Sequence, residues 1–256
     1  MNDSAEDIKK LPEENRWYYV LGKVMSVPGV KVNRELFLRE CFAKYCDDDK
    51  VMAIIEKGTF RADVSLKLLD NMAKKVINRH KVIAVGASAL AGIPGGLAMI
   101  GTVPADFAQY YFHVLQVAQK LAYIYGYPDL EQGGDEDFVA YVTFFIGVMS
   151  GVGAATKGIT ELSQMIANSA IKRLPRMALT KTAIYPLVKQ IAKVLGVKMT
   201  KEIFAKGVAK IIPIAGALTS GGLTLVMFSL EAGRLKKSLR NDFILQQKIG
   251  NDIDSI

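Results

Sequence analysis

The chain has 256 residues, of which half are apolar and 23% are charged, with 22 glycines and a formal net charge of +8. A chain of this length can bury a large core as one domain, and this composition excludes a disordered, collagen-like or low-complexity protein. Two cysteines, Cys41 and Cys46, are too few for a disulfide-rich secreted scaffold, and two histidines leave little material for a metal site. We therefore expect a reducing compartment, no cofactor and no metal.

The N-terminal third is predicted to be a short tail followed by helices. Residues 1–14 are expected to form the tail, and residues 15–256 a single domain. The first 25 residues contain no early apolar run, so we expect no secretory signal peptide. Apolar residues at spacings of three and four predict helices over residues 35–45, 50–56 and 62–77.

Three stretches without charge, residues 82–105, 138–156 and 211–230, are each about long enough to cross a bilayer. Glycines and prolines interrupt the first and the third, and such residues kink or break helices. The first stretch is either two short buried helices joined by a turn or a broken hairpin that dips into a membrane. The soluble interpretation is favoured, because apolar helices of 10–14 residues are common in protein cores.

Helical periodicity continues through the rest of the chain. After Pro104, apolar residues recur at spacings of three and four as far as Tyr125, and a loop over 128–136 follows. A second amphipathic helix is predicted over 184–195, with Gly196 as its C-cap. Because strand signals are weak, we predict an all-α fold, a single bundle-like domain with Gly-rich apolar helical hairpins.

Positive charge is concentrated between Lys157 and Lys210, where eleven bases face two acids, and the rest of the chain is close to neutral. Such a segment attracts phosphate, either on nucleic acid or on an anionic lipid surface. Nucleic acid is the less favoured partner, because the bases alternate with aliphatic rather than aromatic residues. The bases that we expect to contact the membrane are Arg173, Arg176, Lys181, Lys189 and Lys193.

Asp106, Tyr110 and His113 are the candidates for catalysis. Their spacing places a carboxylate, a phenol and an imidazole on one face of a helix, where they could transfer protons. The favoured alternative is that Asp106 stabilises the first helical turn and that His113 is a hydrogen-bonded core residue. No nucleophile elbow and no phosphate-binding loop accompanies them.

Glycines spaced four apart, at 92 and 96 and again at 147 and 151, remove side chains from one edge of an apolar helix. Tight packing inside a soluble bundle is the favoured explanation, and a glycine zipper that inserts into lipid is the alternative. The glycines that we expect at lipid or membrane contacts are Gly92, Gly95, Gly96, Gly147, Gly151, Gly216, Gly221 and Gly222.

Two blocks of the sequence resemble the EcsC protein family. They are GASALAGIPGGLAMIGTVPADFAQYYFHVLQVAQKLAYIYGYPDL, residues 86–130, and KIIPIAGALTSGGLTLVMFSLEAGRLKKSLR, residues 210–240. The first combines a Gly-rich apolar segment, a Pro-Ala-Asp turn and a helix that ends in a Tyr-Gly-Tyr element. The resemblance implies a bacterial protein, in some cases encoded beside an ABC exporter, and it implies no settled activity.

From these observations we expect a non-enzymatic, membrane-associated or lipid-binding protein that docks on anionic membranes through its basic segment. A membrane-inserting effector is a sharper form of this hypothesis, and a hydrolase that uses Asp106 and His113 is the alternative. The expected partners are an anionic membrane surface or lipid, with a membrane transporter or a second copy of the chain as further candidates. The expected location is the cytoplasm, peripheral to or inserted in the inner membrane.

Overall fold

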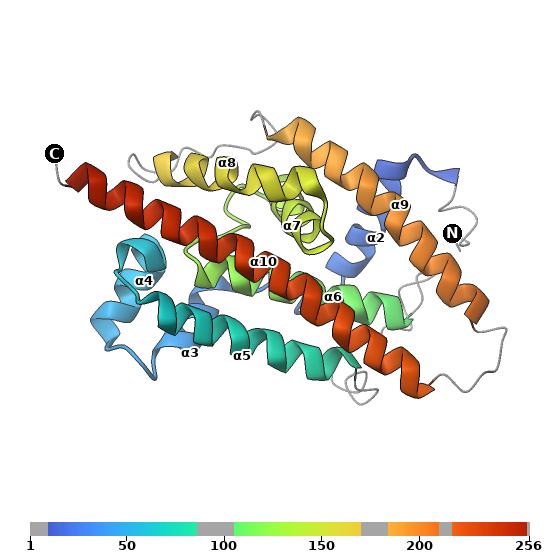
Figure 1. Ribbon diagram of the computed structural model, residues 1–256, viewed down its shortest axis with the longest axis horizontal. Helices are drawn as coiled ribbons and strands as arrows, with labels where there is room; N and C mark the ends of the chain where they lie inside the picture. The colour runs from blue at the N-terminus through green and yellow to red at the C-terminus, as the bar shows by residue number, and fades with distance from the viewer. Residues whose placement is uncertain (1–9, 86–104, 170–183, 210–216, 255–256) are drawn as a thin grey trace.

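Every regular element in the part of the chain that the computed structural model describes, residues 10–85, 105–169, 184–209 and 217–254, is an α-helix. This confirms the predicted all-α fold (Figure 1). In chain order the helices are α2 (Glu13–Met25), α3 (Arg34–Phe42), α4 (Asp48–Arg61), α5 (Leu66–Val85), α6 (Ala105–Ile124), α7 (Asp135–Met149), α8 (Gly153–Ser169), α9 (Tyr185–Ala209) and α10 (Ala217–Asp254).

Helix α7 lies at the centre of the bundle, in contact with α6, α8, α9 and α10. Beyond its acidic first turn it is apolar on all sides, and a helix with that pattern must be covered on every side. Phe138, Phe144 and Phe145 are each almost completely buried. Trp17 of α2 is also fully buried, and its indole nitrogen donates to the Thr143 hydroxyl at 2.8 Å, which attaches α2 to this centre.

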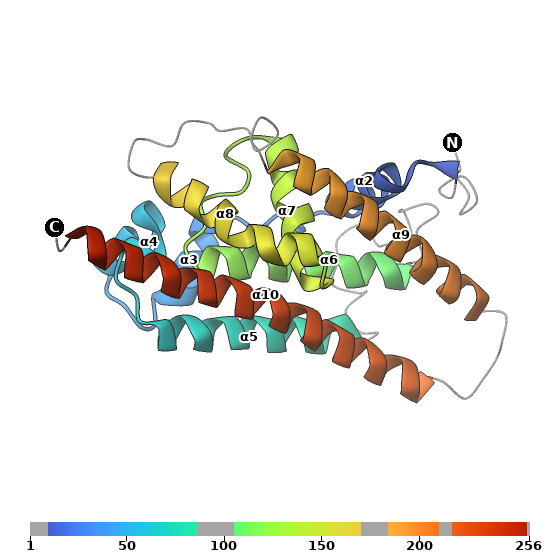
Figure 2. The ribbon, with the colours of Figure 1, turned by 45° about the horizontal axis from the view of Figure 1, so that its top comes forward.

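The helix predicted after Pro104 is α6, and its apolar stripe is buried as expected. Helix α5 runs antiparallel to α6, and the long helix α10 crosses both diagonally (Figures 1 and 2). Asp70 of α5 links α5 to α10 and to Tyr125, the residue directly after α6. Its carboxylate accepts from the Tyr125 hydroxyl at 2.8 Å and from Arg240 Nε at 2.8 Å, and it lies 3.4 Å from Lys236 Nζ.

The prediction that Gly196 caps a helix is wrong, because α9 continues through it to Ala209. Gly196 is buried at the crossing of α9 with α2, where a β-carbon would overlap the backbone carbonyl of Glu13. The glycine is therefore required by the close approach of two helices. Glu13 and Glu14, which fall within the expected tail, form the first turn of α2.

The other predicted boundaries differ from the structure by a few residues. The helices expected at 35–45 and 50–56 are α3 and α4, and α4 extends on both sides of its predicted range. The helix expected at 62–77 begins only at Leu66, after Asp63 with its positive φ of 48°, and it continues to Val85. The loop expected at 128–136 ends at Gly134, because Asp135 and Glu136 join the first turn of α7. Acids are favoured there by the helix dipole.

Two of the uncharged stretches can be compared with the structure. Residues 138–156 do not form one helix, since α7 ends at Met149 and α8 begins at Gly153. Gly151 lies in the intervening turn with φ 71°, so Gly147 and Gly151 do not form the expected helical edge. Gly221 and Gly222 lie inside α10 and do not interrupt it. Gly92, Gly95, Gly96, Pro213 and Gly216 lie outside the described residues.

Candidate functional site

Helix α5 ends, and α6 and α10 begin, at one end of the bundle (Figures 1 and 2). Apolar side chains near this end are exposed. Val82 of α5 is 68% exposed, and Val226, Met227 and Leu230 of α10 are 56%, 43% and 52% exposed. We call these four residues the apolar end. All four lie in two of the stretches that the sequence marks as uncharged, 82–105 and 211–230.

Helical phase explains why these side chains face outward. Phe228, Ala232, Leu235 and Leu239 of α10 recur at spacings of three and four and are buried against the bundle. Val226 and Leu230 are four residues apart on the opposite face, and the next outward positions along that face are Gly233 and Lys237. The outward face of α10 therefore changes from apolar to basic as it leaves this end.

Along α5 the side chains change from basic to apolar towards this same end. Between Lys74 and its end at Val85 it carries four bases, Lys74, Lys75, Arg79 and Lys81, and no acid. Val82 follows them on an exposed face. Because α5 and α10 are antiparallel neighbours, their exposed apolar residues lie at the same end of the bundle. Their bases lie further from that end along each helix.

The residues proposed for catalysis have different partners. The Tyr110 hydroxyl donates to the carboxylate of Glu231 in α10, and Nδ1 of His113 lies 3.1 Å from Nδ1 of His80 in α5. Asp106 lies in the first turn of α6, and its side chain is not among those described. The structure thus places Tyr110 against α10 and His113 against α5.

The hydrogen bonds of the two histidines determine which nitrogens carry protons. Lys120 Nζ lies 2.9 Å from His80 Nε2, and an ammonium can only donate, so Nε2 is the acceptor. His80 then donates from Nδ1 to Nδ1 of His113, which leaves the His113 proton on Nε2. Neither nitrogen of His113 is available to accept a proton from a substrate.

Burial keeps both imidazoles neutral. It lowers the pKa of His80 to about 2, with the nearby charge of Lys120 as a further cause, and the pKa of His113 to about 4. His113 is 4% exposed, and its Nε2 has no hydrogen-bond partner among the described atoms. These properties favour the structural role for His113 over a general base.

The glycines within the described residues serve packing and chain reversal. A β-carbon at Gly147 would lie 2.5 Å from Ile191 Cγ2 and 3.1 Å from Ala155 Cβ, so Gly147 allows α7 to pack closely against α9 and α8. Gly151 provides the turn between α7 and α8. Gly221 and Gly222 lie in α10, and only their helical backbone is described.

Of the bases expected at the membrane, Lys189 and Lys193 are described, and both are exposed on α9. Lys189 Nζ lies over the Tyr185 ring, 5.3 Å from its centroid, and Lys193 Nζ lies 3.6 Å from Glu13 of α2. Arg173, Arg176 and Lys181 lie outside the described residues.

Two further findings concern the described ranges as a whole. They contain no group of three or more His, Cys, Asp or Glu side chains arranged to hold a metal ion. None of the helices in these ranges combines the length and the apolar character that a membrane span needs.

Comparison with known proteins adds no identification. No protein-family model matches the chain, and searches of the curated proteins and of the solved structures found no match either. The resemblance to the EcsC family stays a prediction from its two sequence blocks.

Proposed function

We propose that this protein is a non-enzymatic lipid-binding protein that docks peripherally on anionic membranes with its apolar end. The observation that carries this proposal is the change from basic to apolar side chains along two antiparallel helices that reach the same end of the bundle. Peripheral membrane proteins bury apolar side chains at the boundary of headgroups and acyl chains, and bases beside them attract the anionic headgroups.

The charges around the apolar end support this orientation. Lys81 of α5 directly precedes Val82, and Lys237 of α10 follows Leu230 by two helical turns. The acid Glu231 is engaged by the Tyr110 hydroxyl. Apart from this end, the exposed Lys189 and Lys193 of α9 belong to the segment, residues 157 to 210, in which the sequence concentrates positive charge, and Lys193 also pairs with Glu13. Each base that reaches an anionic surface contributes about 1 kcal/mol of attraction.

The hydrolase alternative has less support. Its two described residues, Tyr110 and His113, have separate partners, and both nitrogens of His113 are accounted for by the proton assignment above. No observation on the described residues favours a reaction over binding.

Co-sedimentation with vesicles of cardiolipin and phosphatidylcholine tests the role of the apolar end. The double substitution Val226→Ser and Leu230→Ser should reduce binding about tenfold, because two exposed side chains lose the gain from entering the lipid boundary. Leu245→Ser is the matched control, since Leu245 is 38% exposed on the same helix but lies towards its other end. Equal binding by the parent, the double variant and the control would overturn this docking orientation.

The same assay tests the basic segment. Lys189→Gln combined with Lys193→Gln should weaken binding to the anionic vesicles roughly tenfold and should reduce the salt dependence of that binding. Glutamine is chosen because a glutamate at 193 would face Glu13 and disturb the packing of α2 on α9. Binding of the parent to pure phosphatidylcholine as tight as to the anionic vesicles would show that charge does not direct docking.

A further inference from the structure

A groove of about 500 Å³ lies between α3, α5 and α6, apart from the apolar end. Its volume is in the range of sites that hold small organic ligands. Its apolar lining includes Phe37 of α3 and Met72 and Val76 of α5. Phe37 and Met72 are also part of the buried core, so this lining is held rigidly by the fold.

The polar lining of the groove is strongly basic. It includes Lys44, Lys75, Arg79 and Lys120, which come from three separate parts of the chain. The one acid among the lining residues is Glu40. Four bases against one acid leave an excess of three positive charges in a concave site, where the field of like charges is concentrated.

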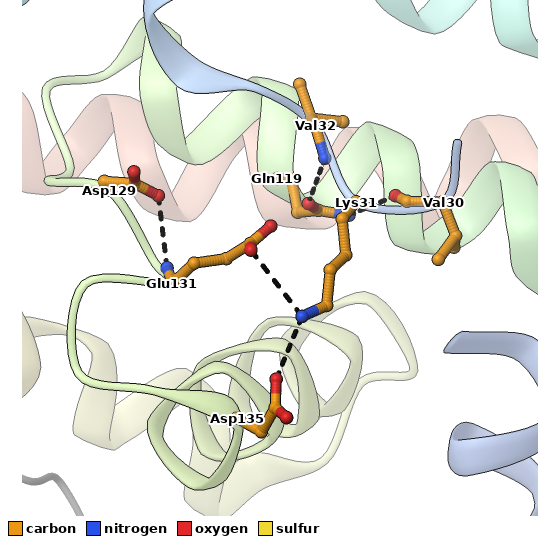
Figure 3. A network of polar contacts seen from close by, with 7 residues as sticks. All are labelled: Val30, Lys31, Val32, Gln119, Asp129, Glu131 and Asp135. Atoms are coloured by element: carbon orange, nitrogen blue, oxygen red, sulfur yellow. Dashed lines mark hydrogen bonds and ion pairs between the residues drawn. The ribbon is translucent and has the colours of Figure 1, made fainter. Parts of the chain in front are cut away.

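A fifth base, Lys31, also lines the groove, but its charge is balanced elsewhere. Figure 3 shows its ammonium directed at two acids, Asp135 at 2.9 Å and Glu131 at 3.6 Å. Its position is set by Gln119 of α6, whose buried side-chain amide accepts from Val32 N and donates to Val30 O, both at 2.9 Å (Figure 3). Lys31 is therefore left out of the excess charge.

Lys120 is the most precisely held of the groove bases. Its ammonium donates to Gln116 Oε1 at 2.9 Å and to His80 Nε2 at 2.9 Å, and His80 is in turn held by His113. These contacts use two of its three N–H donors on neutral partners and leave the third for a ligand. Burial, and next the charge of Arg79, lower the pKa of Lys120 to about 8, and the nearby Glu40 offsets only part of this effect.

Lys75 is also held by a neutral group. Its ammonium donates to the Tyr45 hydroxyl at 2.5 Å and lies 5.1 Å from the centre of the Tyr45 ring. A phenol orients the lysine but does not neutralise it. The groove thus combines cations in fixed positions with an apolar lining.

We infer that the groove between α3, α5 and α6 is a binding site for a phosphate monoester that carries an apolar group, with the phosphate held by Lys75, Arg79 and Lys120. A phosphate monoester is close to doubly negative at neutral pH, and guanidinium and ammonium groups are its usual partners in proteins. The apolar group packs against Phe37, Met72 and Val76. This site goes beyond the proposed membrane docking and shares no residue with the apolar end.

Isothermal titration calorimetry with three probes tests this inference: inorganic phosphate, phenyl phosphate and dioctanoyl phosphatidate below its micellar concentration. Phenyl phosphate and the phosphatidate should both bind more tightly than inorganic phosphate, because they add contact with the apolar lining. Phosphatidate tighter than phenyl phosphate would identify a lipid headgroup as the source of the phosphate, and the reverse order would identify a soluble phosphate ester.

Substitutions locate the binding. Arg79→Gln and, separately, Lys120→Met should each weaken phenyl phosphate binding about tenfold or more, because each removes a hydrogen bond to a charged group. Lys74→Gln is the matched control, since Lys74 is an exposed base beside Lys75 on α5 and does not line the groove. Arg79 is exposed, so Arg79→Gln should keep the parent's melting temperature and remain informative if Lys120→Met unfolds.

Two results would overturn the inference: no binding of any of the three probes, or an equal effect of Arg79→Gln and Lys74→Gln. The Val226→Ser and Leu230→Ser variant should bind phenyl phosphate as the parent does. That comparison separates a failure of the groove from a failure of membrane docking.

Discussion

Gly196 shows how a single missing side chain sets the distance between two helices. Gly196→Ala should destabilise the protein by about 1–3 kcal/mol, because the new β-carbon would overlap the Glu13 carbonyl and push α2 away from α9. This loss should outweigh the gain in helix propensity of about 1 kcal/mol. Urea denaturation followed by the fluorescence of Trp17, which is buried in α2, measures the change.

Gly22 provides the control for this prediction. It lies in α2 itself, and a β-carbon there would meet nothing within 4 Å. Gly22→Ala should therefore be neutral or stabilising by up to about 1 kcal/mol. If both alanine variants unfold at the parent's midpoint, the close approach of α2 and α9 has no energetic importance.

Asp242 of α10 should make the stability of the fold depend on pH. It is 4% exposed, and burial raises its pKa to about 6, although Ser163 and Gln246 form hydrogen bonds that favour its charged form. A carboxyl whose pKa is higher in the folded than in the unfolded protein stabilises the fold at low pH. That stability is fully present below the unfolded value of about 4 and is lost as the pH rises through about 6.

Asp242→Asn should therefore stabilise the protein at pH 8 and not at pH 4. The gain at pH 8 is at most about 3 kcal/mol, from the difference between the two pKa values. The free energy of unfolding of parent and variant at the two pH values measures it. If Asp242→Asn changed the free energy of unfolding equally at pH 4 and at pH 8, the ionisation of Asp242 would not be linked to folding.

At the scale of elements, the turn between α7 and α8 depends on backbone conformation rather than on space. A β-carbon at Gly151 would meet Arg234 Nη1 at an ordinary 3.6 Å, but φ is 71°. Gly151→Ala should cost about 1–2 kcal/mol, and Gly151→Asn should cost less, because asparagine tolerates this region.

The midpoint of urea denaturation measures this difference. Gly153→Ala is the comparison, since Gly153 begins α8 with a negative φ and open space around it. A loss of stability at Gly153 as large as that at Gly151 would mean that φ does not explain the effect.

Local periodicity predicts α3, α4, α5, α6 and the first half of α9, and several of its failures have physical causes. The apolar stripe after Pro104 gave α6 nearly to the residue, because one face of that helix is continuously buried. Gly196 was misread because a glycine that ends a helix and one that allows a close approach look alike in a sequence. The break between α7 and α8 falls within an uncharged stretch, where hydropathy alone gives no boundary.

At the scale of the whole molecule, neither candidate site could be assembled from local patterns. The concentration of bases between residues 157 and 210 is a feature of the linear sequence, but the groove bases Lys44, Lys75, Arg79 and Lys120 lie outside that segment. They meet because α5 and α6 are antiparallel and α3 lies beside them. Val82 and Leu230 come to one end because α5 and α10 are also antiparallel neighbours, which is a property of topology.

The diagonal path of α10 has a consequence for how the protein is made. Ribosomes synthesise α10 after α4, α5, α6, α7 and α8, all of which it contacts. Until it emerges, the faces that receive Phe228, Leu235 and Phe243 stay open to chaperones and to other nascent chains. At usual translation rates its 38 residues take roughly 2–8 s to make. Every copy therefore passes through a period in which the side of the core that α10 covers is exposed.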